Sequence, residues 1–180
     1  MLKSKMESLN NLATLLDRRY KELKQQGIRF TMIYDMVNSE LINTTYRYYY
    51  NELKLKEHHP WKFSYDLKDN GGVYDDVSKS ISLNYEIIRP VDYLLAGLDE
   101  KDEHKKEQYY DMGIQLLSSV VHELRHAWQD EMGMLVGLTY VTAEEDFERY
   151  QQQDIERDAR EYQSKFFTKE FFEYLLNNYK

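Results

Sequence analysis

The residues of this chain whose types and spacing could do chemistry are His122, Glu123 and His126, which form the pattern His-Glu-x-x-His. In an α-helix, side chains four residues apart lie on the same face, so both imidazoles can bind one zinc ion. Glu123 follows the first histidine directly, and its carboxylate can take a proton from a metal-bound water and pass it to a leaving amine. The metal is needed because it lowers the pKa of that water to about 7. The motif therefore predicts a zinc site that hydrolyses peptide bonds.

A catalytic zinc ion usually has three protein ligands and one open position, so a third ligand must be found. The chain has no cysteine, and no histidine follows His126. His104 lies in a charged segment, and His58 and His59 precede a proline. We expect these three histidines to lie on the surface, where they are not ligands.

The third ligand is therefore expected to be an acid on a helix that follows the motif. The apolar periodicity of that region places Glu148, Glu156 and Asp158 near its buried face and leaves the choice between them open. The alternative to a metal site is a pair of core histidines with partners inside the protein. Two histidines and a glutamate on a stripe of Leu, Val and Trp are costly to bury unless something binds or pairs them.

The element that must position the motif is a helix predicted from about His104 to Met132, with a broad apolar stripe. Other helices are predicted over residues 4–26, 31–57, 142–167 (with a break near 151–153) and 169–179. Local signals support three of these boundaries: Gly27 as a C-terminal residue, Thr142 with Glu145 as a capping box, and Thr168 as a cap.

Apolar and polar residues alternate in three short runs, 61–67, 73–74 and 79–85, which is typical of half-buried strands. We expect these consecutive runs to form an antiparallel meander. The sequence thus predicts an α+β fold in which a small, mostly antiparallel sheet lies beside a helical bundle. A length of 180 residues fits one domain, 1–180, with an N-terminal helical part over 1–58 and the core over 60–180.

Composition narrows the classes of function. Hydrophobic residues make up 42% of the chain and charged residues 31%, as in a globular protein, and the net charge is −8. A basic cluster at Lys101, Lys105 and Lys106 is surrounded by acids, so we expect no nucleic acid partner. No run approaches the roughly 20 apolar residues of a membrane span, and the start of the chain is amphipathic. We expect no membrane partner and a cytoplasmic location.

The run Val-His-Glu-Leu-Arg-His-Ala-Trp-Gln over 121–129, followed by Glu-Arg-Asp-Ala over 156–159, resembles the gluzincin metallopeptidases. It is most similar to their minimal bacterial and phage members and to the ImmA/IrrE-like group. The resemblance covers about residues 60–166 and implies a zincin-like core, a zinc cofactor and a peptide or protein substrate. It also implies that Glu156 is the third ligand and that Asp158 supports the site from outside the ligand set. Arg125 departs from the pattern, because many relatives have a small residue there.

The resemblance implies two further features of the site. Residues 72–84 resemble the strands that precede the active helix, whose edge strand pairs with extended substrate. These peptidases usually have a Tyr or His that donates a hydrogen bond to the oxyanion. Tyr150 stands where related sequences have such a tyrosine, and Tyr140 is the rival.

Two other functions stay open at the level of sequence. One is a catalytically inactive, zinc-stabilised module that binds a partner protein, and the other is a helical interaction protein without a metal. The presence of Glu123 favours an enzyme, because a binding module needs the histidines but not the base. The sequence does not indicate an oligomeric state.

Overall fold

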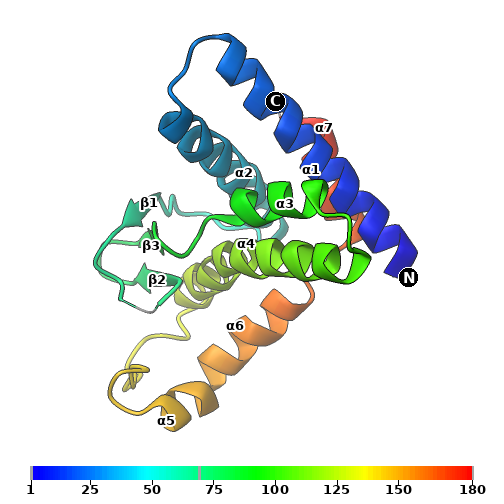
Figure 1. The fold of residues 1–180 in the computed structure, drawn as a ribbon. Helices are drawn as coiled ribbons and strands as arrows, with labels where there is room; N and C mark the ends of the chain where they lie inside the picture. Colours follow the sequence, from blue (N-terminus) through cyan, green and yellow to red (C-terminus); the bar gives the residue numbers. More distant parts are fainter. Residues whose placement is uncertain (1, 69, 180) are drawn as a thin grey trace.

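The segment that contains the motif forms α4 (Glu103–Glu131), which runs through the middle of the molecule (Figure 1). The computed structural model describes residues 2–68 and 70–179. Asp102 caps α4, because its side chain accepts hydrogen bonds from the backbone N–H groups of His104 and Lys105. The prediction of a buried helix from about 104 to 132 is therefore confirmed.

The described helices around α4 are α1 (Leu2–Gln25), α2 (Phe30–Glu52), α3 (Pro90–Asp99), α5 (Phe147–Gln152), α6 (Asp154–Ser164) and α7 (Lys169–Asn178). The predictions of α1, of α7 with its Thr168 cap and of a break near 151–153 are confirmed. None of the helices among the described residues combines the length and the apolar character that a membrane crossing requires.

The predicted end of α2 was wrong, and α3 was missed. α2 ends at Glu52 and not near 57, because Lys54 adopts a positive φ of 55° and the N–H of Leu55 bonds to the carbonyl of Tyr50 at 3.2 Å. α3 was not predicted, because it has only 10 residues and no side-chain cap. It begins at Pro90, whose ring fixes a helical φ. The missing N–H of proline costs no hydrogen bond there, because the first N–H groups of a helix have no partner within the helix.

The capping box at Thr142 and Glu145 is present, but it does not start a helix. The N–H of Thr142 donates to Glu145 Oε2 at 2.9 Å, and the N–H of Glu145 donates to Thr142 Oγ1 at 3.3 Å. These bonds close a single turn, and α5 begins only at Phe147, with Asp146 as its cap. The local signal was correct, but the helix start predicted from it was wrong.

The sheet consists, among the described residues, of β1 (Trp61–Ser64), β2 (Gly72–Asp75) and β3 (Ser80–Asn84) in the order β1-β3-β2. β2 and β3 form an antiparallel pair, whereas β1 and β3 are parallel. The predicted antiparallel meander is therefore wrong, and the sheet is mixed. The Nδ2 atom of Asn84 donates to the carbonyls of Lys68 and Asn70 and so ties the β1–β2 connection to the end of β3.

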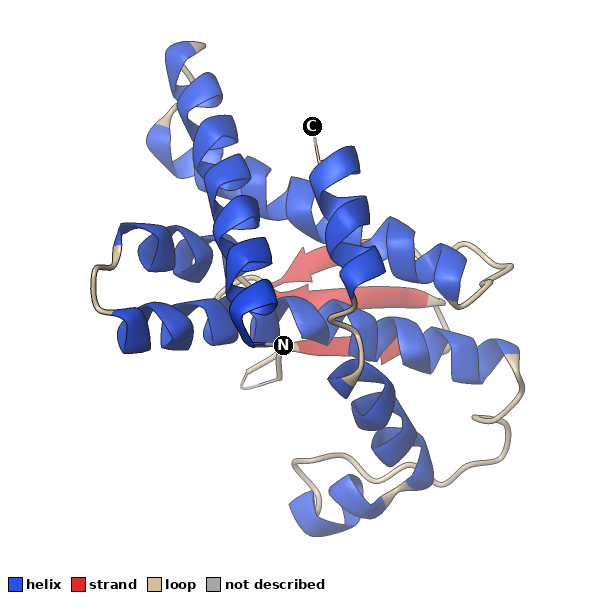
Figure 2. Ribbon diagram, turned by 90° about the vertical axis from the view of Figure 1, so that its right-hand side faces the viewer, coloured by secondary structure: helices blue, strands red, loops and turns tan. Residues whose placement is uncertain are grey.

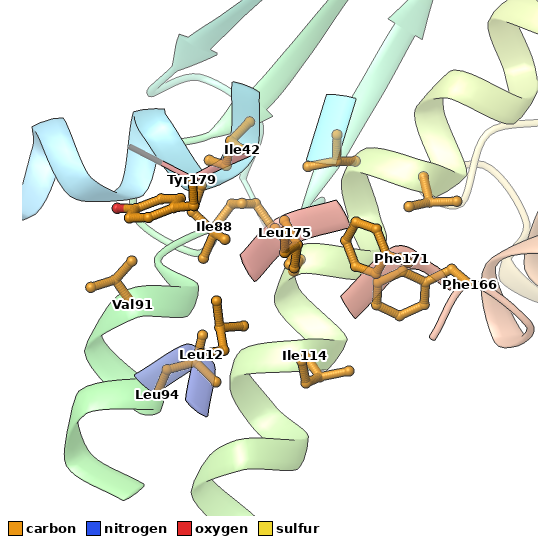
Figure 3. Close-up of a cluster of buried hydrophobic side chains, with 14 of the residues drawn as sticks. Leu12, Ile42, Ile88, Val91, Leu94, Ile114, Phe166, Phe171, Leu175 and Tyr179 are labelled. Atoms are coloured by element: carbon orange, nitrogen blue, oxygen red, sulfur yellow. The ribbon is translucent and has the colours of Figure 1, made fainter. Parts of the chain in front are cut away.

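Helices cover one face of the sheet (Figure 2), and α4 contacts both β2 and β3. The core is one cluster of buried apolar side chains that extends from Leu9 in α1 to Tyr179 after α7. The N-terminal helices contribute to this cluster, since α1 packs on α3 and α7 and α2 packs on α4. Figure 3 shows part of it: Leu12, Ile42, Ile88, Val91, Leu94, Ile114, Phe166, Phe171, Leu175 and Tyr179. The observed architecture is an α+β fold with one shared core.

Candidate metal centre

α4 and α6 pack against each other and bring two histidines and one glutamate together. His122 and His126 face α6, and Glu156 lies in the first turn of α6, where a helix favours negative charge. The Nε2 atoms of the histidines are 3.1 Å apart. His122 Nε2 lies 3.4 Å from Glu156 Oε2, and His126 Nε2 lies 3.3 Å from Glu156 Oε1. The side chain of Glu156 is fully buried.

This cluster fits a divalent metal ion in two respects. Glu156 Oε2 is buried and has no hydrogen-bond partner among the described residues, although Arg160 Nη1 lies 3.6 Å away. A buried carboxylate oxygen that accepts no hydrogen bond is costly unless a cation lies beside it. Ligand atoms placed tetrahedrally at zinc distances are separated by about 3.3 Å, and the contacts within this cluster are 3.1 to 3.4 Å.

Of the three candidate acids, the structure brings only Glu156 to the histidines. Glu148 is exposed on α5. Asp158 accepts two hydrogen bonds from Arg125, with Nε to Oδ2 at 2.7 Å and Nη2 to Oδ1 at 3.0 Å, and this pairing lowers the pKa of Asp158. Arg125 also stacks on Trp128, 3.7 Å from its ring centroid. Arg125 thus ties α4 to α6.

Glu123 lies beside the ligand cluster and against β2. It is 5% exposed, and this burial raises the pKa of its carboxyl group, whereas a hydrogen bond from the backbone of Tyr74 acts in the opposite direction. Gly72 makes room for it, because a Cβ atom at that position would lie 2.8 Å from Glu123 Cγ. Sequence reasoning missed this role of Gly72. The signal was a glycine at the start of a strand, which often marks a close approach.

A cleft of about 440 Å³ opens over the cluster. His122, Glu123, His126 and Glu156 all line it. β2 has a neighbouring strand on one side only within the described sheet, and residues 72–74 of β2 form part of the cleft wall. The cleft also has apolar walls from Leu135, Leu138, Ala143 and Ile155.

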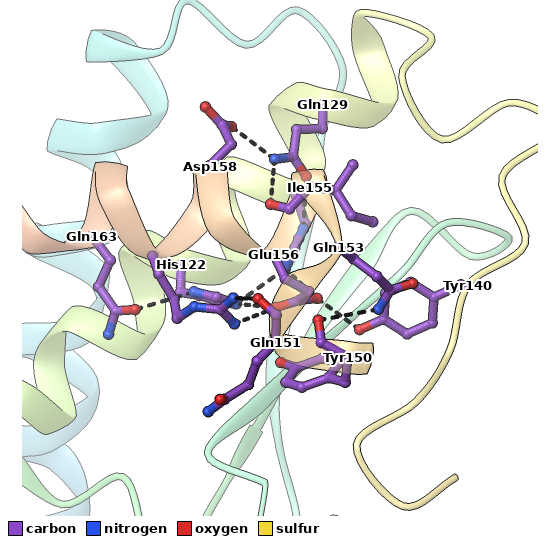
Figure 4. Close-up of polar contacts among 12 residues, drawn as sticks. His122, Gln129, Tyr140, Tyr150, Gln151, Gln153, Ile155, Glu156, Asp158 and Gln163 are labelled. Atoms are coloured by element: carbon purple, nitrogen blue, oxygen red, sulfur yellow. Dashed lines mark hydrogen bonds and ion pairs between the residues drawn. The ribbon is translucent and has the colours of Figure 1, made fainter. Parts of the chain in front are cut away.

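Both candidate tyrosines line this cleft (Figure 4). The hydroxyl of Tyr140 donates to Glu156 Oε1 at 2.7 Å. The ring of Tyr150 lies 6.3 Å from that of Tyr140. Burial and the nearby Glu156 carboxylate raise the pKa of both phenols, so both remain protonated donors at neutral pH. Tyr140 therefore supports the candidate ligand Glu156, and Tyr150 lies close to the same carboxylate.

The prediction that His59 lies on the surface was wrong. Its side chain is fully buried, and its Nε2 lies 3.0 Å from Glu131 Oε1 at the end of α4. The hydroxyl of Tyr74 lies 3.3 Å from its Nδ1. His58 and His104 are exposed, as predicted. The partners of His59 lie on β2 and α4, so its burial could not be predicted from the residues next to it in the sequence.

Comparison of the chain with protein-family models, with curated proteins and with solved structures finds no match. The class of protein therefore rests on the fold and the site alone. They define an α+β protein with a buried cluster of His122, His126 and Glu156 that could hold a metal ion.

Proposed function

We propose that this chain is a zinc-dependent metallopeptidase of the gluzincin type with a zincin-like core. In this proposal His122, His126 and Glu156 hold the zinc ion, and Glu123 is the general base. The observation that carries it is the buried Oε2 of Glu156, which accepts no hydrogen bond from the described residues and faces the imidazole of His122 in the same cleft as the buried Glu123. Two imidazoles and one carboxylate with an open position favour zinc over other divalent ions.

Zinc in this site would polarise the scissile carbonyl and acidify the attacking water. Glu123 would accept a proton from that water and return it to the leaving amine, because its carboxylate lines the same cleft as the two histidines. Tyr150 donates a hydrogen bond to the developing oxyanion, and Tyr140 orients Glu156. The free edge of β2 takes the substrate as an extended strand.

The substrate is accordingly a peptide or an extended segment of a protein. Its backbone is recognised by β2, and its side chains contact the apolar walls of the cleft. We propose the cytoplasm as the place of this activity, which is compatible with a chain that has no cysteine and forms no disulfide.

The decisive experiment is Glu123→Gln in the zinc-loaded protein, with an unfolded protein as the substrate and mass spectrometry to detect new termini. We expect the cleavage rate to fall by about 10²- to 10⁴-fold, because the base is lost, while zinc remains bound. Glu148→Gln is the matched control, because Glu148 is an exposed acid on α5 and its replacement should leave the rate unchanged. Cleavage by Glu123→Gln at the wild-type rate would refute the assignment of the base.

A second candidate function is a catalytically inactive, zinc-stabilised module that binds a partner protein. One observation favours it: the segment after α4, beside the cleft, exposes several large apolar side chains. They are Met132, Met134, Val136, Leu138 and Phe147. This function predicts stoichiometric zinc in a protein that cleaves no bond in any unfolded substrate, and the same experiment distinguishes it from the peptidase.

A further inference from the structure

Each imidazole of the candidate metal centre turns its second ring nitrogen toward a glutamine. His126 Nδ1 lies 2.8 Å from Gln129 Oε1, and His122 Nδ1 lies 3.1 Å from Gln163 Oε1. Gln129 is fully buried on α4, and Gln163 is partly buried on α6. Figure 4 shows the two glutamines on different sides of Glu156. An amide can donate or accept, so its orientation decides where the histidine proton lies.

The orientation of Gln129 is fixed by Asp158. Gln129 Nε2 donates to Asp158 Oδ2 at 2.8 Å and to the carbonyl of Ile155 at 2.9 Å. The carbonyl oxygen of Ile155 can only accept, and Asp158 Oδ2 already accepts from Arg125 Nε. The NH₂ group of Gln129 must therefore face Asp158, and its oxygen must face His126. It follows that Nδ1 of His126 carries a proton.

The orientation of the Gln163 amide follows from its hydrogen bond with Ser118. Ser118 Oγ donates its only proton to the carbonyl of Gln115 at 2.6 Å. While it makes this bond, the hydroxyl accepts from Gln163 Nε2, which lies 2.6 Å away. The oxygen of Gln163 consequently faces His122, and Nδ1 of His122 is also protonated.

We propose that Gln129 and Gln163 are positioning residues that hold both imidazoles with the proton on Nδ1 and the Nε2 atom toward the metal. This inference rests on the proposed function, because it assumes that the cluster binds zinc. With neutral imidazoles, two Nε2 lone pairs meet at 3.1 Å and repel each other until a cation lies between them. Gln163 and the partners of Gln129 lie on α6, so the packing of α4 on α6 sets the orientation of both ligands.

The two glutamines should respond differently to replacement by glutamate. In Gln163→Glu the hydroxyl of Ser118 can rotate and donate to the new carboxylate, and a carboxylate partner makes the imidazole a better ligand. In Gln129→Glu the new carboxylate faces Asp158 and the carbonyl of Ile155, so it finds no donor there and is repelled. We expect zinc affinity to rise about 10-fold in the first variant and to fall about 10- to 100-fold in the second.

The experiment measures zinc dissociation constants of metal-free protein by competition with a chromogenic chelator, together with the thermal unfolding of the metal-free state. Gln163→Leu, which removes the acceptor, should bind zinc about 10-fold more weakly. Gln115→Glu is the matched control, because its side chain is exposed on the same helix as the histidines, and its affinity should equal that of the wild type. A purely structural role would destabilise both Gln163 variants and raise the affinity of neither.

The failures of the two proposals are distinguishable. Wild-type zinc affinity in both Gln163 variants, in a protein that binds zinc, would overturn the positioning role alone. Affinities that change as expected in a protein that cleaves nothing would support the positioning role and refute the peptidase. A wild type that binds no zinc would overturn both.

Discussion

Two buried clusters of histidine and carboxylate lie along the last three turns of α4, and they differ in how far their polar atoms are paired. In the cluster of His122, His126 and Glu156, Glu156 Oε2 has no hydrogen-bond partner among the described residues. In the cluster around His59, both ring nitrogens have partners, Glu131 and the hydroxyl of Tyr74.

The two carboxylates of the second cluster, Glu131 and Asp130, also have hydrogen-bond partners. The carboxylate of Glu131 also accepts from the N–H groups of Lys56 and Glu57, at 3.0 and 2.8 Å. Asp130 accepts from Tyr74 at 2.6 Å and pairs with Lys79 at 2.5 Å. These bonds hold the segment after α2 and the β2–β3 hairpin on the end of α4. Within the described part of the chain, no buried side-chain atom of this cluster lacks a hydrogen-bond partner.

The comparison teaches that burial of a histidine does not by itself indicate a metal site. His59 is more deeply buried than His126, yet its environment is that of a core histidine with internal partners. The criterion that distinguishes a candidate metal site from a core histidine is whether every buried acceptor has a hydrogen-bond donor. A carboxylate oxygen without a donor, facing a neighbouring histidine nitrogen, favours a cation.

The largest effect that could break this comparison is on zinc affinity. His126→Ala removes one of the proposed ligands. We expect the zinc dissociation constant to rise by more than about 100-fold, a larger effect than that of replacing a residue that only hydrogen-bonds to a ligand. His59→Ala should leave it within about twofold, because its cluster is saturated. Competition with a chelator measures both. Equal losses of affinity in the two variants would show that the clusters are not functionally distinct.

The next largest effect is on the free energy of unfolding, and it is expected for a substitution in the cluster around His59. Glu131→Ala leaves His59 and the backbone N–H groups of Lys56 and Glu57 without their buried acceptor. We expect the free energy of unfolding of the metal-free protein to fall by about 3 kcal/mol in urea titrations. The control is Glu52→Ala, an exposed acid at the end of α2, which should change it by less than about 0.5 kcal/mol. A change in zinc affinity in Glu131→Ala would contradict the separation of the clusters.

The smallest effect is on the pH dependence of stability. Burial acts to raise the pKa of Glu131, but hydrogen bonds from Glu57 N–H and His59 outweigh it, so the pKa lies below its ordinary value of 4.5. A carboxyl group with a lowered pKa in the folded state stabilises above about pH 4.5 and loses that contribution as the pH falls through the folded pKa.

Below about pH 4.5, the free energy of unfolding of Glu131→Gln should therefore fall less steeply with falling pH than that of the wild type. The two slopes should differ by at most about 1.4 kcal/mol per pH unit. Chemical unfolding at a series of pH values measures the slope. Parallel curves for the two proteins would show that Glu131 does not carry this charge-dependent stabilisation.

The features that could be predicted from the sequence are local. α4 follows from its apolar periodicity, and the C-terminal residue Gly27 and the cap Thr168 act within one turn of the helices that they end or begin. The strand positions also follow from alternation. By contrast, the order of the strands involves contacts between distant residues, such as the bonds from the Asn84 side chain to backbone atoms 14 and 16 residues away.

The missed features depend on contacts between distant segments. α3 packs so closely on α4 that a Cβ atom at Gly97 would lie 2.5 Å from the ring of Tyr110, and no periodicity within 10 residues reveals such a contact. The burial of His59 depends on Glu131, 72 residues away. Local propensities do not encode distances of this kind.

The sequence by itself determined that His122 and His126 share one helix face with Glu123 beside them, because the spacing of side chains along a helix is a local property of the backbone. Only the tertiary structure decided which acid joins them. The crossing of α4 and α6 places Glu156 at the histidines, and the pairing of Arg125 with Asp158, 33 residues away, removes the rival acid. That selection depends on the packing of two helices, which no pattern within either helix specifies.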